Sequence, residues 1–129
     1  MRLLLDTHAL LWWFAGDTAL PPRARQAVAE PDAEILVSAA SIWEIATKYR
    51  LGRLPGIEPL MRDLSSALAG QGFVALPITI RHAEAAGALP GSHRDPFDRM
   101  LIAQAMLEDL TLVSNETLFD TYALRRLWA

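Results

Sequence analysis

The sequence contains no cysteine, has only three histidines and carries no excess of positive charge. Without cysteine, disulfides and thiolate metal sites are excluded, which fits a reducing compartment. The histidines, His8, His82 and His93, have no metal-ligand spacing among themselves. A formal net charge of -3 excludes a generally basic nucleic-acid binder. Any anionic substrate must therefore be held by local positive charge or by a metal ion.

Long apolar runs are also missing. The first residues, MRLLLDTHALLWWFAG, superficially suggest a signal peptide, but Asp6 and His8 interrupt the apolar stretch. No segment has the uninterrupted apolar length that is needed to span a bilayer. The chain has 129 residues, of which 52% are apolar and 21% charged, and this predicts one globular domain over residues 1–129. We expect a soluble, cytoplasmic protein without a membrane partner.

Short apolar segments alternate with helical patterns along the chain. Strands are predicted at 2–6, 34–38, 73–78 and 110–114, with a last strand around 124–128. The helices predicted between them include one continuous helix over 58–70. Short strands that are apolar throughout are typical of a parallel sheet covered on both faces. The sequence therefore predicts an α/β fold of three α/β/α layers around a central, mostly parallel sheet of about five short strands.

Acidic residues follow several of these strands. Ligands of parallel sheets bind beyond the carboxyl ends of the strands, so polar residues at this edge are candidate site residues. Four separate chain segments bring acids toward it: Asp6, Glu44, Asp98 and Glu116, the last preceded by Ser114 and Asn115. We expect these segments to converge on one site.

Each of these acids could also have a purely structural role. Asp6 could cap the helix that follows it, and Glu44 could pair with Ser41 in a capping box. Asp98 falls in the first turn of a helix, where a carboxylate complements the helix dipole. Glu116 alone fits a solvated loop acid. These explanations are independent of one another, whereas a single site accounts for all four acids.

Carboxylates that converge would require a cation. Two like charges about 4 Å apart repel by roughly 4 kcal/mol at an effective dielectric constant near 20, so several acids must bind protons or a metal. Oxygen ligands suit Mg²⁺ or Mn²⁺. An ion held by a few carboxylates keeps positions for a phosphate oxygen and an attacking water. The residues therefore predict phosphodiester hydrolysis by water that Mg²⁺ or Mn²⁺ activates.

Three stretches, LLLDTHALLW, SAASIWEIATKYRLGRL and DPFDRMLIAQAMLEDLTLVSNETLF, together resemble the PIN-domain ribonucleases. The resemblance is strongest to the VapC toxins of type II toxin–antitoxin pairs and spans nearly the whole chain. It implies a PIN-like fold, usually a homodimer, that hydrolyses RNA as a metal-dependent endoribonuclease and is inhibited by a VapB-type antitoxin. By position in the motifs, Asp6, Glu44 and Asp98 correspond to the first three family acids, and Asp95 remains the cap of its helix.

The fourth family position departs from the usual pattern. The family usually has threonine, one further residue and then aspartate or asparagine, whereas this chain has Ser114, Asn115 and Glu116. Serine can still orient a water by hydrogen bonding. The resemblance therefore implies Ser114 as a catalytic residue and Glu116 as the fourth catalytic and metal-binding acid, with Asn115 as its alternative and Asp120 as a surface acid.

Two other functions remain open from the residues. A catalytically inactive PIN-like module that binds RNA or protein would need the acids only as caps. A phosphatase with a strand-end aspartate normally places a second aspartate two residues later, where this chain has His8.

Several neighbouring residues have expected secondary roles. We expect Arg94 and Arg99 to steer phosphate, and Lys48 to solvate the end of its helix or contact RNA. The aromatic run of residues 12–14 is expected mainly in the core, with part of it available to a dimer or antitoxin contact.

Overall fold

The computed structural model describes residues 1–91 and 93–129. Its elements, in chain order, are β1 (Arg2–Leu5), α1 (Thr7–Ala15), α2 (Pro22–Ala29), β2 (Glu34–Ser38), α3 (Ala39–Arg50), α4 (Glu58–Met61), α5 (Leu64–Gly70), β3 (Val74–Leu76), α6 (Ile80–Ala88), α7 (Pro96–Leu107), β4 (Thr111–Val113), the 3-10 helix η1 (Thr117–Thr121) and β5 (Arg125–Leu127). None of the described helices combines the length and hydropathy required to cross a bilayer.

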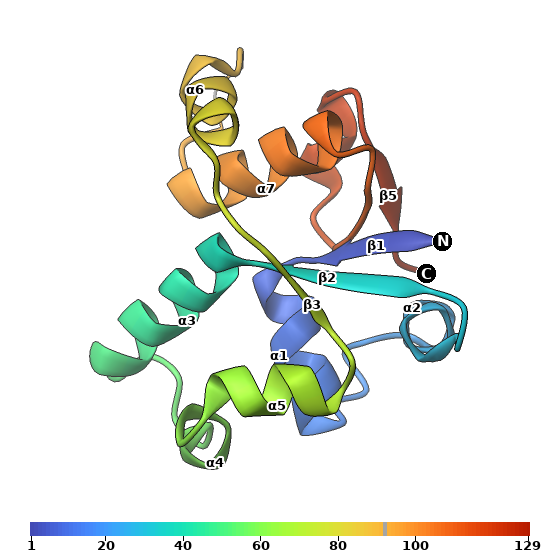
Figure 1. The fold of residues 1–129 in the computed structure, drawn as a ribbon, viewed down its shortest axis with the longest axis vertical. Coiled ribbons are helices and arrows are strands. Elements are labelled where there is room, and N and C mark those ends of the chain that lie inside the picture. The colour runs from blue at the N-terminus through green and yellow to red at the C-terminus, as the bar shows by residue number, and fades with distance from the viewer. Residues whose placement is uncertain (92) are drawn as a thin grey trace.

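The five strands form one parallel sheet in the order β3-β2-β1-β4-β5 (Figure 1). β1 lies at the centre, where Leu4 is in register with Leu36 of β2 and with Leu112 of β4. Each predicted strand is present within one or two residues of its expected bounds, and the fold prediction is confirmed. Because all strands run the same way, their carboxyl ends meet at one edge of the sheet.

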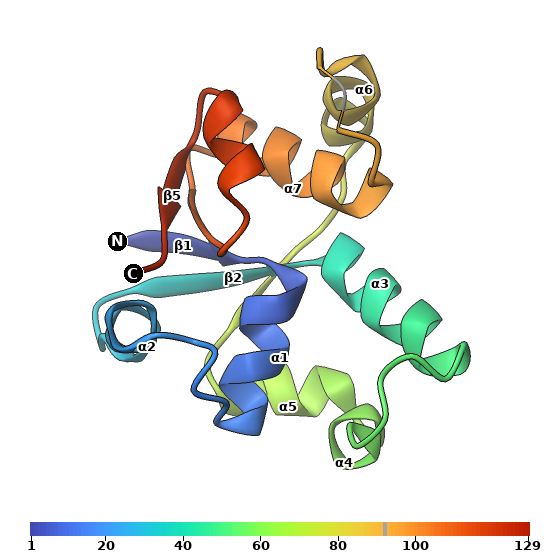
Figure 2. The ribbon, with the colours of Figure 1, turned by 180° about the vertical axis from the view of Figure 1, so that it is seen from behind.

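Helices cover both faces of the sheet, as Figures 1 and 2 show from opposite sides. Side chains alternate between the faces along each strand. Leu3 and Leu5 point into a core that also contains residues of α1, α2 and α3. Leu4 points into the other core, which is formed with α7 and η1. The central strand is thus buried on both faces, which fixes the position of the residue that follows it.

Two local predictions are wrong. The expected helix over 58–70 is divided into α4 and α5, because the Asp63 side chain accepts a hydrogen bond from the Ser66 N–H and starts a new helix there. The capping box of Ser41 and Glu44 does not form, since α3 begins earlier. Its cap is Ser38, whose hydroxyl accepts from the Ala40 N–H at 3.0 Å. Glu44 is therefore free for other contacts.

Candidate active site

Asp6 joins the central strand to α1 and combines two roles. Its Oδ1 accepts a hydrogen bond from the Ala9 N–H at 2.8 Å, so the residue caps α1 as predicted. Its own N–H donates to the carbonyl of Val113 in β4, which fixes the residue at the sheet edge. The side chain is nevertheless buried, and this burial raises the pKa of the carboxyl, against the opposing effects of the Ser114 hydroxyl and the Ala9 N–H. Capping and a functional carboxylate are therefore compatible here.

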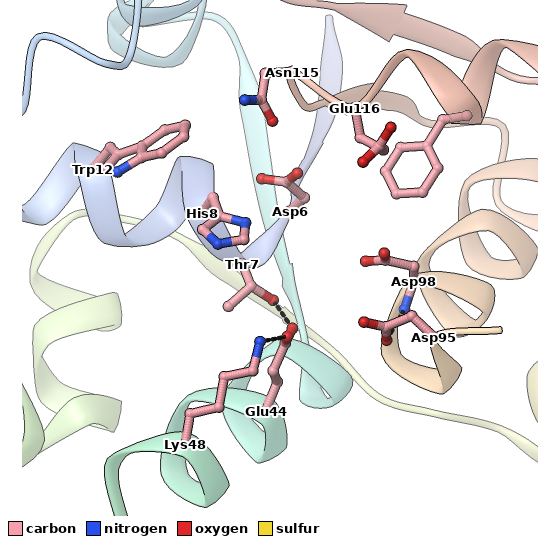
Figure 3. Close-up of a pocket in the computed structure, with 11 residues that line it drawn as sticks. Asp6, Thr7, His8, Trp12, Glu44, Lys48, Asp95, Asp98, Asn115 and Glu116 are labelled. Carbon is pink, nitrogen blue, oxygen red and sulfur yellow. Dashed lines mark hydrogen bonds and ion pairs between the residues drawn. The ribbon is translucent and has the colours of Figure 1, made fainter. Parts of the chain in front are cut away.

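Glu44 lies on α3 and points toward α1 (Figure 3). The residue is only 3% exposed. Its Oε1 accepts a hydrogen bond from the Thr7 hydroxyl at 2.6 Å, and its Oε2 forms an ion pair with the Lys48 ammonium group. Since a buried charge is costly without partners, these two contacts compensate for the burial of the carboxylate and orient it.

Asp95 behaves as the predicted cap of α7. Its Oδ1 accepts hydrogen bonds from the N–H groups of Phe97 at 2.9 Å and Asp98 at 3.2 Å. Pro96 occupies the first helical position, where its missing N–H is not needed. Because Asp95 occupies the cap, the Asp98 carboxylate is not required there.

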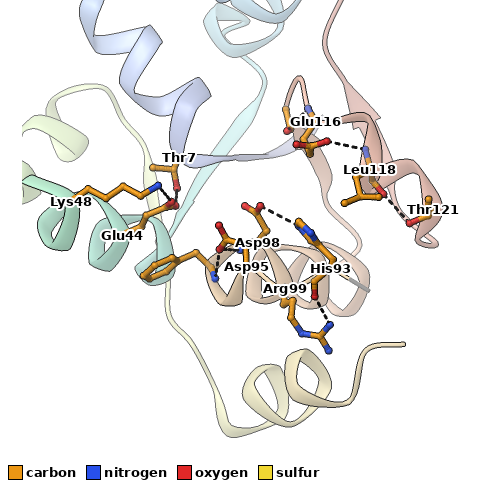
Figure 4. Close-up of polar contacts among 12 residues, drawn as sticks. Thr7, Glu44, Lys48, His93, Asp95, Asp98, Arg99, Glu116, Leu118 and Thr121 are labelled. Carbon is orange, nitrogen blue, oxygen red and sulfur yellow. Dashed lines mark hydrogen bonds and ion pairs between the residues drawn. The ribbon is translucent and has the colours of Figure 1, made fainter. Parts of the chain in front are cut away.

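The Asp98 carboxylate points away from the helix terminus, and His93 approaches its Oδ2 with Nε2 at 3.1 Å (Figure 4). Burial, and then the charge of Asp95, raise the pKa of Asp98 to about 7, with smaller contributions in the same direction from Glu44 and Asp6. His93 acts in the opposite direction. Glu44 and Asp6 are thus near enough to Asp98 for their charges to be felt there.

The fourth segment follows β4. Ser114 is fully buried, and its hydroxyl accepts a hydrogen bond from the Glu116 N–H at 3.0 Å. Glu116 is exposed and its Oε1 accepts from the Leu118 N–H, which makes it the cap of η1. Asp120 forms paired hydrogen bonds with Arg126, in agreement with the prediction that it is a surface acid.

The four segments meet around one cavity of about 380 Å³ at the carboxyl edge of the sheet (Figure 3). The residues that line it come from α1, α3, the start of α7 and the segment after β4: Asp6, Thr7, His8, Trp12, Glu44, Lys48, Asp95, Asp98, Asn115, Glu116 and Phe119. Asp6, Glu44, Asp98 and Glu116 therefore line the same cavity, as we expected from the common edge at which parallel strands end.

The donor atoms of this cavity suit a hard divalent cation, because its acids supply only oxygen. The raised pKa values of Asp6 and Asp98 also indicate a site in which added positive charge would relieve unfavourable negative charge. Within residues 1–91 and 93–129, however, no three acidic or imidazole side chains are grouped as they would be around a metal ion. Glu44 is engaged by Thr7 and Lys48, and Asp98 by His93. Metal binding therefore requires these side chains to turn farther into the cavity.

Arg99 does not have the role expected from the sequence. Its guanidinium group donates hydrogen bonds to backbone carbonyls of the segment before α7, those of Ala86, Gly87, Leu89 and His93. It therefore holds the segment that carries His93, and the prediction that it steers phosphate is wrong. Arg94 is exposed and is not one of the residues lining the cavity.

Sequence reasoning also missed contacts that shape the cavity. The spacing of Glu44 and Lys48, four residues apart on one helix, is the signal that could have identified their ion pair. No comparable spacing rule relates His93 to Asp98 or Thr7 to Glu44. The aromatic run divides: Trp13 and Phe14 pack against Phe73, whereas Trp12 lines the cavity.

Comparison with known proteins agrees with this architecture. The family profile described as PIN domain matches residues 3–124. Ribonuclease VapC22 of Mycobacterium tuberculosis (strain ATCC 25618 / H37Rv) is 32% identical over 115 residues, which cover 88% of this chain and 86% of that protein. The fold is similar to that of a chain in the crystal structure of VapBC2 from Rickettsia felis bound to a promoter DNA fragment, with a TM-score of 0.74, 17% identity and full coverage of both chains. A chain of a toxin–antitoxin complex from Klebsiella pneumoniae gives a TM-score of 0.68 at 22% identity, covering 97% of this chain and 95% of its own. The sequence match and the shared fold together show that this chain belongs to the PIN-domain family.

Proposed function

We propose that this protein is a metal-dependent endoribonuclease and the toxin of a VapBC-type toxin–antitoxin pair. The observation that carries the proposal is the cavity at the sheet edge, where acids from four chain segments face one another. The sequence relative named as a ribonuclease supports the reaction class. The structural neighbours described as VapBC and toxin–antitoxin complexes support the biological setting.

Asp6, Glu44 and Asp98 are the residues that we propose hold Mg²⁺ or Mn²⁺, with Glu116 as the fourth acid. Such an ion, when bound, activates water for attack on phosphorus and stabilises the charge that develops on the phosphate oxygens. Asp6 is fixed by the end of β1 and by the Ala9 N–H. Thr7 would hold Glu44, and His93 would hold Asp98, until the two carboxylates turn into the cavity.

Other residues of the chain would bind and position the RNA. Among the described residues lining the cavity, Lys48 is the one lysine or arginine. Its ammonium group can donate to a phosphate oxygen of the substrate once Glu44 turns into the cavity. The buried Ser114 hydroxyl holds the backbone of Glu116 and faces Asp6. It is therefore placed to orient the loop that carries the fourth acid.

The acidic cavity also suggests how a VapB-type antitoxin would inhibit the enzyme. A basic side chain from the antitoxin would complement the carboxylates and compete with the metal for them. Both proteins would act in the cytoplasm, where the cellular RNA is present. A chain without cysteine forms no disulfides, which suits this reducing compartment.

We propose that the protein forms a homodimer in which a second copy of the chain covers an apolar patch next to the acidic cavity. Trp43 is 63% exposed and Ile78 37% exposed, and both line an apolar cavity of about 220 Å³ between α3, α6 and α7. Trp43 also packs edge-on against Phe97, at 5.1 Å between ring centroids. Exposed aromatic and aliphatic side chains beside an apolar hollow are typical of protein interfaces. Each subunit would bring its acidic cavity close to the interface, because Trp43 and Phe97 directly precede Glu44 and Asp98.

Replacing Trp43 with glutamate is expected to convert the homodimer into a monomer, since a charge would be buried at the centre of the interface. Light scattering coupled to size-exclusion chromatography measures the molar mass. Met106→Glu, a similar change of an exposed apolar residue on α7, is the control and should remain dimeric. A wild-type protein that is monomeric at all concentrations would contradict the proposed dimer.

The ribonuclease proposal is tested by incubating the purified protein with bulk transfer RNA in EDTA, Mg²⁺ or Mn²⁺. We expect defined fragments with 5′-phosphate ends only when metal is present. Induction in cells should arrest growth, and co-expression of a VapB-type antitoxin, to be sought in a short open reading frame immediately upstream, should relieve the arrest. RNA that stays intact with every metal would favour the inactive binding module, the alternative supported by the lack of a preformed group of metal ligands in the described residues.

A further inference from the structure

We propose that Trp12 and His8 form a stacking platform for one nucleobase of a single-stranded RNA, next to the acids that face the scissile phosphate. This inference rests on the proposed ribonuclease function and specifies the form of its substrate. It concerns two aromatic side chains on the cavity wall that the metal site does not use.

The two rings lie on one rigid helix with one of the acids. His8 and Trp12 are four residues apart on α1, so they share one helix face and are separated by about 6 Å along its axis. Their ring centroids are 5.5 Å apart with an angle of 33° between the ring planes. Both rings line the same cavity as Asp6, which caps α1 (Figure 3).

The Trp12 ring is partly buried and also lines the cavity. Trp128 packs against it at 5.8 Å between ring centroids, and the core under α1 contacts it as well. His8, by contrast, is exposed. A ring that its neighbours already fix, and that still lines a cavity, loses little conformational entropy when a base stacks on it.

The adjacent tryptophan shows what a purely structural role on this helix looks like. Trp13 donates its Nε1–H to Gln71 at 3.0 Å, stacks at an angle on Phe73, and is not among the residues that line the acidic cavity. Trp12 makes no side-chain hydrogen bond within the described residues and faces the acids instead. Core packing alone explains why Trp13 is a tryptophan, but it does not explain why Trp12 lines the cavity.

The charge of the cavity favours stacking as a source of RNA affinity. Among the lining residues that the structure describes, five are acids, Asp6, Glu44, Asp95, Asp98 and Glu116, and one is a lysine, Lys48. Binding of RNA through phosphate contacts depends on positive charge, which this surface has little of. Stacking on an aromatic ring does not depend on charge and strengthens binding roughly 5- to 150-fold per base. It also requires an unstacked base, which single-stranded loops and ends provide.

The experiment compares two ligands by fluorescence anisotropy in EDTA, which stops metal-dependent cleavage. One is a fluorescein-labelled decauridylate, and the other is the same ribose-phosphate chain without bases. Trp12→Ala is expected to weaken binding of decauridylate about 10-fold and to leave binding of the abasic chain unchanged. Trp12→Phe, which keeps an aromatic ring, should restore most of the affinity, and His8→Ala should give a smaller loss.

Trp13→Ala is the matched control, because it removes an equally large side chain from the same helix without changing the cavity wall. It should bind both ligands as the wild type does. Equal binding of decauridylate by the wild type and Trp12→Ala would overturn the platform, as would an equal loss for both ligands. If Trp12 mattered for binding but no RNA were cut with Mg²⁺ or Mn²⁺, the ribonuclease proposal would fail while the platform remained. If RNA were cut but Trp12→Ala bound normally, only the platform would fail.

Discussion

Replacing Asp98 with asparagine is expected to slow metal-dependent RNA cleavage by about 1,000-fold, because a neutral amide cannot replace a carboxylate beside a catalytic cation. The two side chains have nearly the same shape, so the fold should be kept. Initial rates at saturating Mg²⁺ or Mn²⁺ measure the effect. Residual activity within 10-fold of the wild type would contradict the assignment of Asp98 to the metal site.

The same substitution is expected to stabilise the metal-free protein. Burial and neighbouring acids raise the pKa of Asp98 to about 7, so near pH 8 the folded protein carries an unfavourable charge that asparagine removes. An increase of a few degrees in the melting temperature, on the order of 1 kcal/mol, is expected in EDTA. A loss of activity together with a gain of stability cannot arise from misfolding.

Asp95→Asn provides the matched control, three residues earlier in the chain. Asparagine is as good a helix cap as aspartate, so the hydrogen bonds to the N–H groups of Phe97 and Asp98 should be kept. We expect cleavage within about 10-fold of the wild type and an unchanged fold. If both substitutions abolished cleavage equally, the division of roles between the cap and the metal-binding acid would be wrong.

The fold was predictable because its signals are local. The strands at the centre of the sheet are short apolar runs bounded by polar or helix-starting residues, such as the segment that ends at Asp6. Their uniform hydrophobicity follows from burial on both faces, which only a layered parallel sheet provides. Once the strands are known, the edge at which acids gather follows from their shared direction.

The contacts inside the site were harder to predict from the sequence, because local patterns suggested other partners for the same residues. The sequence offered Ser41 as a capping partner for Glu44, yet the actual partner, Thr7, lies 37 residues away in the chain. The partners of Arg99 could not be predicted either, because they are backbone carbonyls. Every residue has a backbone carbonyl, so no pattern of residue types predicts which carbonyls a side chain will bind.

The stability of the metal-free protein is expected to fall as the pH rises from about 4 through about 7. The ordinary pKa of Asp98 is 3.8 and the folded value is about 7, so between them the folded protein binds a proton that the unfolded chain has released. Raising the pH removes this proton and its stabilising effect. Asp6, with its pKa also raised by burial, acts in the same direction. Because the Asp98 carboxyl is partly exposed, we expect a total effect of roughly 1–3 kcal/mol.

Divalent metal is expected to reverse this loss, and to do so more strongly at higher pH, because the ion binds only the ionised carboxylates. At a concentration 100 times its dissociation constant, Mg²⁺ or Mn²⁺ would stabilise the protein by about 2.7 kcal/mol. Thermal melts in EDTA and in metal, from about pH 5 to about pH 8, measure both effects. In Asp98→Asn the pH dependence in EDTA should shrink and the gain from metal should largely disappear. Asp95→Asn, which removes one of the charges that raise the Asp98 pKa, should reduce the pH dependence only in part and should retain the gain from metal. A melting temperature that rises with pH in EDTA, or one that metal leaves unchanged near pH 8, would mean that the gathered acids serve the fold and not a cation.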